Sequence, residues 1–289
     1  MAGKQTFILG IGCQKAGTTW LWDYLNSIDE ITFTQPKELH VFDAMLRPEL
    51  HAQFLFKARV QHLSRTPLQK LRHKLGWYEP GFVRAKQRIE MIANPQAYVE
   101  YFRSLDPSAK AVGEITPSYA TLNASHFRFI RELLEPHFNL RVVLLLRDPV
   151  HRAFSAAKHL IRGYKRNFPI ALGSDPNEFL ESILETSYIL ERQDYERLLL
   201  SLDEAFEPGQ VHVEFYERLF TDEAVRSLTE FVGVEAKKAD FAKQVNAGLQ
   251  TSSLDPKMAK RAGEIYSGTY EYCRQRFGAE LIDKIWLTT

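Results

Sequence analysis

Two segments of the chain share the order apolar strand, polar loop and helix. Residues 6–10 form a short apolar run that ends in glycine and is typical of a buried strand, and residues 18–28 place apolar side chains at helical spacing. Residues 141–146 are apolar and β-branched, as expected of a strand covered on both faces, and residues 149–161 begin with a proline that fits the first turn of a helix. The pattern therefore predicts two strand–loop–helix units.

The rest of the chain predicts further strands and helices around these units. Residues 44–108 are polar and rich in aromatic side chains without a regular period, so we expect helices and loops there. The other predicted elements are a strand at 110–113, helices at 176–189 and 191–206, a strand at 211–215, and a helix at 221–232 closed by Gly233. Alternating strands and helices predict an α/β fold with a mainly parallel sheet, and no linker divides residues 1–289, so we expect a single domain.

Composition excludes several classes of protein. The 289 residues are 45% hydrophobic and 25% charged with a formal net charge of +1, which is ordinary for a soluble globular domain. No global field favours nucleic acid or an anionic membrane, so any anion selectivity must be local. No apolar stretch approaches the ~20 residues of a membrane span. Two distant cysteines, Cys13 and Cys273, predict neither a disulfide framework nor a metal site, and we expect a cytoplasmic protein.

The loop of the first unit, residues 12–20 (GCQKAGTTW), combines the groups that bind a phosphate. Its small residues let the backbone approach an anion, the following helix N-terminus supplies free N–H groups, and Lys15 adds a full charge. In the P-loop of ATPases and GTPases the lysine follows the glycine, whereas Lys15 precedes Gly17. The loop therefore predicts an anion site of another kind, unless its glycines serve only a tight strand-to-helix turn.

The loop of the second unit carries two further groups suited to a phosphate. Arg147 lies just beyond the carboxyl end of its strand, where open α/β sheets bind ligands, and Ser155 falls about two turns into the next helix. A guanidinium and a hydroxyl can converge on one phosphate from these positions. Arg152 lies between them, and either a ligand contact or a structural ion pair would account for it.

Together the two motifs resemble those of sulfotransferases that use 3′-phosphoadenosine-5′-phosphosulfate (PAPS). In that family a K-x-G-T-T-like run binds the 5′-phosphosulfate and an R-[ND]-P-x-x-R-x-x-S run binds the 3′-phosphate. The resemblance implies a P-loop-like central parallel sheet flanked by helices, and a lysine that also stabilises the leaving phosphate. It assigns PAPS binding to Lys15, Ala16, Gly17, Thr18, Thr19, Trp20, Arg147 and Ser155.

A third run, residues 36–43 (PKELHVFD), carries candidates for the catalytic base. In an extended segment Glu38 and His40 lie on the same side, and an ordinary histidine pKa of about 6.5 suits proton transfer near neutral pH. The run resembles the E-x-H-x-F-D run of glycosaminoglycan-type (heparan sulfate sulfotransferase-like) enzymes, and the resemblance implies a soluble, bacterial-type member with Glu38 as general base. Asp43 would orient the base or the acceptor, and Lys37 would assist the sulfate. His40 would be a supporting residue or a second candidate base.

Residues 113–119 (GEITPSY) resemble the segment of the same family that ends in T-P-x-Y and lines the acceptor side. The resemblance implies that Glu114 and Tyr119 contact the acceptor. Several carbohydrate-acting relatives have lysine at the position of Glu114, and a glutamate there would disfavour polyanionic acceptors unless it is buried and paired with a basic residue. Some relatives carry a basic C-terminal loop over the 3′-phosphate, but we expect the basic residues at 257–261 to lie on a solvated helix face.

The sequence thus predicts a sulfotransferase that moves the sulfuryl group of PAPS to a hydroxyl or amine of a carbohydrate or other small acceptor, releases PAP (adenosine 3′,5′-bisphosphate) and requires no metal. A P-loop-like kinase or nucleotide-binding protein is disfavoured by the position of Lys15 and by the lack of a Walker-B aspartate after a strand. A protein-tyrosine sulfotransferase would differ in its acceptor, and a binding module without catalysis would not need Glu38. The sequence names neither the acceptor nor the oligomeric state.

Overall fold

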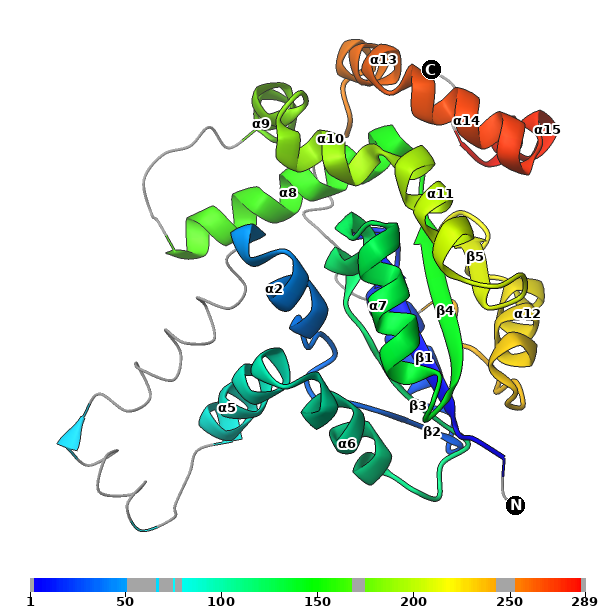
Figure 1. Ribbon diagram of the computed structural model, residues 1–289. Coiled ribbons are helices and arrows are strands. Elements are labelled where there is room, and N and C mark those ends of the chain that lie inside the picture. The colour runs from blue at the N-terminus through cyan, green and yellow to red at the C-terminus, as the bar shows by residue number, and fades with distance from the viewer. Residues whose placement is uncertain are drawn as a thin grey trace.

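A five-stranded parallel sheet lies at the centre of the protein (Figure 1). The computed structural model describes residues 3–50, 66–67, 75, 80–167, 175–242 and 253–286, so part of the irregular stretch at 44–108 lies outside the described residues. The strands are β1 (Thr6–Gly12), β2 (Ile31–Phe33), β3 (Ala111–Ile115), β4 (Asn139–Leu146) and β5 (Val211–Phe215). Every neighbouring pair is parallel in the order β2-β3-β1-β4-β5, which confirms the predicted α/β fold.

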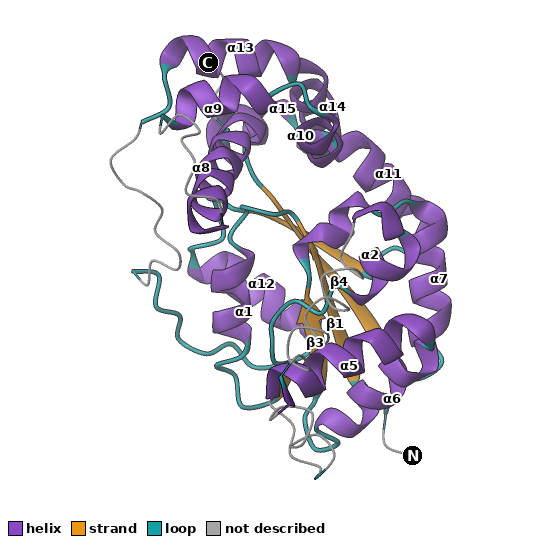
Figure 2. Ribbon diagram, turned by 90° about the vertical axis from the view of Figure 1, so that its left-hand side faces the viewer, coloured by secondary structure: helices purple, strands orange, loops and turns teal. Residues whose placement is uncertain are grey.

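Helices cover both faces of the sheet, which is why its central strands are apolar on both sides. The helices are α1 (Thr18–Leu25), α2 (Val41–Leu46), α5 (Pro80–Ala93), α6 (Pro95–Leu105), α7 (Ala124–Leu134), α8 (Pro149–Asn167), α9 (Pro176–Ile183), α10 (Ser187–Gln193), α11 (Tyr195–Ala205), α12 (Asp222–Val232), α13 (Pro256–Ile265), α14 (Ser267–Phe277) and α15 (Ala279–Ile285), with 3-10 turns η1 (Pro48–Leu50) and η2 (Pro117–Thr121). Figure 2 shows α1 and α12 on one face and α6 and α7 on the other. Within the described part of the chain, no helix is both long and apolar enough to span a membrane.

The central strands approach each other closely because one of them carries a glycine. A Cβ atom at Gly113 in β3 would lie 2.1 Å from the carbonyl oxygen of Ile8 in β1, which is far inside contact distance. Only glycine therefore fits at this point of the β1–β3 pair. Because β1 and β3 are parallel, their carboxyl ends and the loops that follow them lie at the same edge of the sheet.

Two predictions about helix boundaries are wrong. The helices predicted at 176–189 and 191–206 form three helices instead, α9, α10 and α11. Thr186 adopts an extended backbone (φ −70°, ψ 147°) between α9 and α10, and the Asp194 side chain accepts the N–H of Arg197 to start α11. These short capping residues interrupt an apolar period that continues through them. The helix at 221–232 ends at Gly233 in a left-handed conformation (φ 86°), as predicted.

The carboxyl ends of β1 and β4 lie side by side, and the chain leaves them in opposite directions. β1 leads through α1 to β2 at one edge of the sheet, whereas β4 leads through α8 and the helices after it to β5 at the other edge. The N–H of Cys13 donates to the carbonyl of Leu145 (2.7 Å), which ties the loop after β1 to the end of β4. Open α/β sheets bind their ligands at this kind of switch point.

The C-terminal helices hold the loop that follows β4. The hydroxyl of Tyr270 in α14 donates to Asp148 Oδ2 (2.8 Å). The indole N–H of Trp286, just after α15, donates to Glu217 Oε2 (3.2 Å), and Glu217 Oε1 accepts the backbone N–H of Asp148 (3.0 Å). The last helices therefore fix the residue next to Arg147.

Candidate active site

The loop after β1 turns sharply into the N-terminus of α1. Gly17, the residue before the helix, has a left-handed backbone (φ 86°), and no side chain caps α1. A Cβ atom at Gly17 would be strained in this conformation and would lie 3.0 Å from Tyr216 and Leu219. Lys15 also has a positive φ of 69°. An uncapped helix start beside a lysine is suited to an anion.

Arg147 reaches from the end of β4 into this loop. Its Nη1 donates to the backbone carbonyl of Lys15 (2.8 Å), and its guanidinium lies 4.2 Å from the ring centre of Tyr216. The hydroxyl of Tyr195 donates to the Arg147 carbonyl (2.8 Å), so backbone and side chain are both held. The Nε atom of Arg147 is buried and has no hydrogen-bond partner in the described residues. The two predicted anion motifs are therefore in direct contact.

Ser155 and Arg152 follow Arg147 on α8 but differ in their surroundings. Ser155 is half-buried, and its hydroxyl makes no hydrogen bond within the described part of the structure. Arg152 is 2% exposed; its Nε donates to Gln193 Oε1 (3.0 Å), and its Nη1 lies 3.4 Å from the carbonyl oxygen of Gln14. Arg152 therefore supports the anion loop from behind, although its partners are an amide and a carbonyl and not the carboxylate of a structural ion pair.

Lys37 links the third motif to the anion loop. The Lys37 Nζ donates to Thr18 Oγ1 (3.1 Å), and lies 3.5 Å from Thr19 Oγ1 and 3.4 Å from Glu38 Oε1. Burial lowers the pKa of Lys37, while the charge of Glu38 opposes this. The predicted base and the predicted anion loop are thus joined through a single ammonium group.

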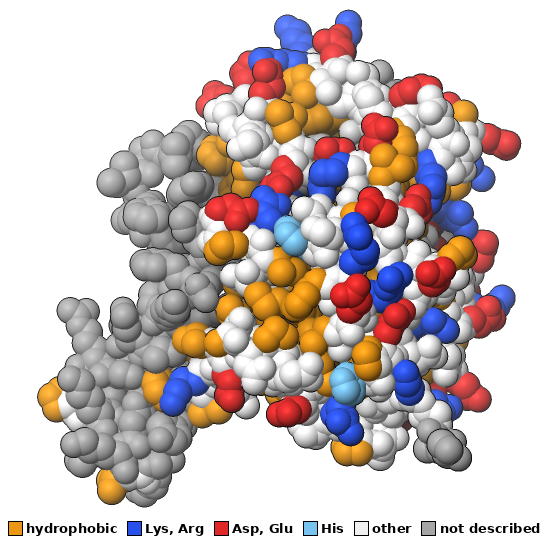
Figure 3. Space-filling model, in the orientation of Figure 1, with side chains coloured by type: hydrophobic (Ala, Val, Ile, Leu, Met, Phe, Trp, Pro, Cys, Tyr) orange, Lys and Arg blue, Asp and Glu red, His pale blue; other side chains and the backbone are white. Residues whose placement is uncertain are grey.

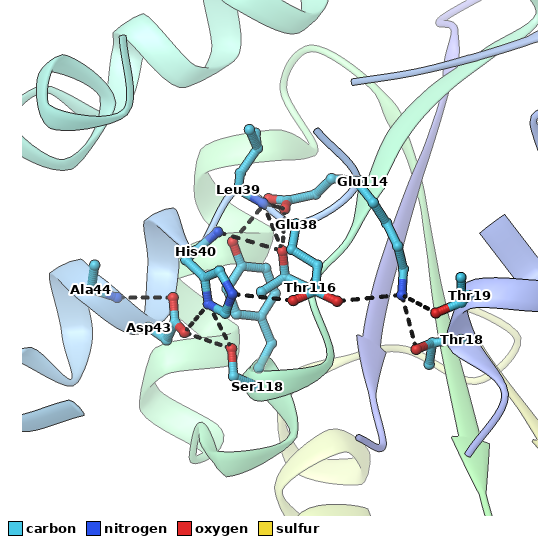
Figure 4. Close-up of polar contacts among 12 residues, drawn as sticks. Thr18, Thr19, Glu38, Leu39, His40, Asp43, Ala44, Glu114, Thr116 and Ser118 are labelled. Atoms are coloured by element: carbon cyan, nitrogen blue, oxygen red, sulfur yellow. Dashed lines mark hydrogen bonds and ion pairs between the residues drawn. The ribbon is translucent and has the colours of Figure 1, made fainter. Parts of the chain in front are cut away.

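His40 lies between two carboxylates. Its Nδ1 is 2.8 Å from Asp43 Oδ2, and its Nε2 is 3.2 Å from Glu38 Oε2 (Figure 4). Burial favours the neutral ring, but the hydrogen bonds and charges of Asp43 and Glu38 outweigh it and raise the pKa of His40 to about 10. A ring that donates from both nitrogens is an imidazolium, which has no lone pair to accept a proton. The geometry thus favours Glu38 over His40 as base.

Glu38 has the most open side chain of these three residues. The exposed fractions of the side chains are 38% for Glu38, 28% for His40 and 3% for Asp43. Burial raises the pKa of Glu38, but the His40 hydrogen bond and the Lys37 charge outweigh it, so the net pKa is lowered and the group is ionised at neutral pH. Asp43 also accepts a hydrogen bond from the hydroxyl of Ser118 (2.5 Å). The arrangement presents one oriented carboxylate at the surface of the site.

Glu114 and Tyr119 lie beneath this segment, away from the protein surface. Both side chains have no exposed surface. The hydroxyl of Tyr119 donates to Glu114 Oε1 (2.9 Å) and accepts the N–H of Val41 (3.1 Å), while Glu114 Oε2 accepts the N–H of Leu39 (3.1 Å). Glu114 is therefore buried, as one alternative held, but hydroxyl and amide donors stand in place of a basic partner among the described residues. A buried glutamate gives no reason to exclude an anionic acceptor.

Comparison with known proteins identifies the family. A family model described as "Sulfotransferase family" matches residues 7–238, which include all three motifs. The chain belongs to the sulfotransferase family. No curated protein sequence matches it.

One solved structure agrees with this assignment at the level of the fold, and two others are reported with it. A sulfotransferase from Alicyclobacillus acidocaldarius superposes with a TM-score of 0.60 at 20% sequence identity, over 95% of this chain and 96% of that chain. A mouse sulfotransferase complexed with PAP has a TM-score of 0.49 at 14% identity, over 98% of this chain and 89% of that one. The sulfotransferase domain of the Synechococcus olefin synthase has a TM-score of 0.44 at 20% identity, over 90% and 87%.

The sulfotransferase carries further cations beside Lys15 that sequence reasoning missed. Burial and the charges of Arg162, Arg147 and Lys37 lower the pKa of Lys15 to about 8. Burial and the charges of Arg147 and Arg162 also lower the pKa of Lys158. Lys158 and Arg162 lie three and seven positions after Ser155, on one face of α8, and this spacing was the available signal. Neither pairs with a carboxylate in the described residues, so the cluster has an excess of positive charge.

Two predicted loop residues of the sulfotransferase are part of its core. Ala16 is fully buried. Trp20 stacks on Tyr24 with 5.5 Å between ring centres, and its indole N–H lies 3.3 Å from the carbonyl oxygen of Asp240. Trp20 therefore anchors α1 to the chain after α12. Whether it also touches a nucleotide remains a prediction.

One face of the sulfotransferase carries charges of both signs. Acidic and basic side chains are interspersed on the face in Figure 3, in keeping with the net charge of +1. In α13, Arg261 pairs with Glu181 (2.7 Å) and Glu185 (3.2 Å) on an exposed surface, which confirms the expected solvated face. The described residues contain no group of three or more His, Cys, Asp or Glu side chains that could hold a metal ion.

Proposed function

We propose that this sulfotransferase takes its sulfuryl group from PAPS and transfers it to a hydroxyl or amine of a carbohydrate or other small acceptor. The observation that carries the proposal is the uncompensated positive charge at the carboxyl ends of β1 and β4. The pKa of Lys15 is lowered to about 8 by burial and neighbouring cations, and Arg147 has a buried Nε without a partner in the described residues. Buried charges are normally paired, so these groups suit an anionic ligand.

The residues present fit a donor with two separate anionic groups. The loop N–H groups, Lys15 and the Thr18 and Thr19 hydroxyls would hold the 5′-phosphosulfate. Arg147 and Ser155, whose hydroxyl makes no hydrogen bond to any described residue, would hold the 3′-phosphate, which ATP lacks. This division distinguishes PAPS from a nucleoside triphosphate, and no observation favours the kinase-like alternative.

The chain's own groups supply what the transfer requires. Glu38 takes the proton from the acceptor hydroxyl or amine as the acceptor oxygen or nitrogen forms its bond to sulfur. His40 and Asp43 fix the orientation of the Glu38 carboxylate. Lys15, Lys37 and the loop N–H groups stabilise the negative charge that develops on the 5′-phosphate as its bond to sulfur breaks. A carboxylate of low pKa suffices if the transition state is loose, as in phosphoryl transfer, because the acceptor proton then leaves late.

The acceptor class rests on the resemblance of the run at 36–43 to the E-x-H-x-F-D run of the glycosaminoglycan-type branch. A protein-tyrosine acceptor remains the alternative.

The location that we propose is the cytoplasm. Both Cys13 and Cys273 are free and buried, which is compatible with the reducing conditions there.

Calorimetric titration with PAP, and separately with ATP plus Mg²⁺, tests the donor assignment. We expect tight PAP binding, little response to ATP, and strong loss of PAP affinity in Arg147→Ala. Arg128→Ala is the matched control, because Arg128 is an exposed arginine paired with Glu204 (2.8 Å). Binding of ATP–Mg²⁺ without PAP binding would overturn the proposal.

A further inference from the structure

We propose that Glu114 is a positioning residue that holds the turn at residues 39–42, and thereby aims Glu38 and His40 at the acceptor. It acts through the hydroxyls of Thr116 and Tyr119. That Glu114 holds residues 39–42 follows from the geometry alone. That this affects turnover rests on the proposed function.

Glu114 receives four hydrogen-bond donors inside the core. Its Oε1 accepts the hydroxyls of Tyr98 (2.6 Å) and Tyr119 (2.9 Å). Its Oε2 accepts the hydroxyl of Thr116 (2.5 Å) and the backbone N–H of Leu39 (3.1 Å). These donors come from α6, η2, the end of β3 and the segment that carries Glu38, so one carboxyl group joins all of them.

The direction of each proton follows from the other partners of these groups. Thr116 Oγ1 accepts the N–H of Leu39 (3.0 Å) and lies 3.5 Å from the N–H of His40, so its own proton points to Glu114. The hydroxyl oxygen of Tyr119 accepts the N–H of Val41 (3.1 Å), so its proton also points to Glu114.

An ionised carboxylate offers four lone-pair sites, and all four are used here. Burial outweighs the opposing effect of its four hydrogen bonds, so the pKa of Glu114 is raised above its ordinary value. No lysine, arginine or histidine in the described part of the chain forms an ion pair with it. A buried anion held only by hydroxyl and amide donors is costly unless every donor stays in place.

The network replaces the backbone partners that the turn lacks. The amides of residues 39–41 donate to side chains of Glu114, Thr116 and Tyr119, and the amide of Phe42 lies 3.4 Å from the Tyr119 hydroxyl. His40 has a left-handed backbone (φ 56°), which is disfavoured for a residue other than glycine. Surrounding contacts must therefore hold this conformation, which sets His40 between Asp43 and Glu38 (Figure 4).

Only an acceptor group fits at position 114. Glutamine has almost the same shape, but its NH₂ group would face two donors whichever way the amide is turned. Lysine has no acceptor at all.

The test compares Glu114→Gln, Thr116→Val and Thr116→Ser with Tyr101→Phe. Thr116→Val keeps the shape and removes the hydroxyl, whereas Thr116→Ser restores it. Tyr101→Phe is the matched control, because Tyr101 lies on the same helix as Tyr98 and its hydroxyl lies 3.3 Å from Thr34 Oγ1, outside the network. Tyr98→Phe, which removes one donor only, takes the place of any variant that does not fold.

Two readouts separate positioning from mere stability. NMR titration of the His40 ring, without any ligand, should give a midpoint of about 10 in the unsubstituted protein. The midpoint should fall toward about 6.5 in Glu114→Gln and Thr116→Val as the contacts with Glu38 and Asp43 loosen. PAP release from PAPS with water as acceptor should fall at least about tenfold in kcat in the same variants, with KM for PAPS within about twofold. Thr116→Ser should restore both values.

The outcomes are distinct. If Glu114→Gln and Thr116→Val match Tyr101→Phe in the His40 midpoint and in kcat, the positioning role is overturned. If the midpoint moves as expected but the unsubstituted protein binds ATP–Mg²⁺ and not PAP, the positioning role stands and the proposed function fails.

Discussion

The lowered pKa of Lys15 makes a quantitative prediction about PAP binding. In the free protein, burial and the charges of Arg162, Arg147 and Lys37 lower the pKa of Lys15 from 10.5 to about 8. A bound phosphate favours the charged ammonium and should restore the pKa to about its ordinary value. A group whose pKa rises on binding takes up a proton, so affinity is full below the free-state pKa and falls as pH rises through it.

The size of the effect follows from these two pKa values. At pH 9 only about one in eleven Lys15 side chains is protonated in the free protein, if its pKa is about 8, whereas nearly all are protonated in the complex. PAP should therefore bind about tenfold more weakly at pH 9 than at pH 7. Calorimetry at pH 9 in two buffers of different ionisation enthalpy should also detect the uptake of about one proton.

Lys15→Met isolates the contribution of this residue. Lys37 and Lys158 also have lowered pKa values and contribute slopes of the same sign. The variant should bind PAP more weakly at pH 7 and should lose most of the pH dependence. Equal affinities of the unsubstituted protein at pH 7 and pH 9, or an unchanged slope in Lys15→Met, would refute the reasoning.

The remaining predictions concern the base, the α8 cations, the metal and the C-terminal helices. Glu38→Gln should lower kcat for PAP release by about 10²–10⁴ with PAP affinity kept; retained kcat would move the base elsewhere. Arg162→Ala should raise the pKa of Lys15 and move the pH midpoint of PAP binding upward; an unmoved midpoint would show that Arg162 does not lower the pKa of Lys15. EDTA should leave PAP release unchanged, whereas inhibition that Mg²⁺ reverses would favour a kinase-like site. Trp286→Ala, at a residue 1% exposed, should lower the free energy of unfolding by about 3–5 kcal/mol in thermal or denaturant unfolding, and a loss below about 1 kcal/mol would contradict its core role.

Much of the fold could be predicted because its central units are continuous in sequence. β1 and β4 are apolar runs followed at once by their loops, so Lys15 and Arg147 could be placed at one sheet edge without any tertiary information. β2 has only three residues and was not predicted, because so short a run has no detectable period. The break between α9 and α10 was missed for a related reason, since the apolar period continues across it.

The role of Glu114 could not be predicted because its partners come from distant parts of the chain. A single sequence gives no sign that Tyr98, Leu39 and Tyr119 would enclose one carboxyl group. The family motif suggested an acceptor contact, whereas burial gives the side chain a supporting place. A motif fixes which residue types occur in a segment, but the side of the segment that each one faces depends on packing.

The donor and acceptor sides of the site are joined through one stretch of chain. Residues 34–37 continue beside β3, because Thr34 N–H donates to Gly113 O (3.2 Å) and Ile115 N–H approaches Lys37 O (3.4 Å). Because this stretch is fixed, the Lys37 side chain reaches the hydroxyl of Thr18 in the anion loop. Glu114 holds the residues that follow by accepting the backbone N–H of Leu39. A change in the charge around Lys37 is therefore felt directly at the carboxylate of Glu38, 3.4 Å away. The Lys37 ammonium can stabilise the leaving phosphate and also keep the Glu38 carboxylate ionised. We therefore expect removal of the Lys37 charge to lower kcat more than it lowers PAP affinity or the free energy of unfolding.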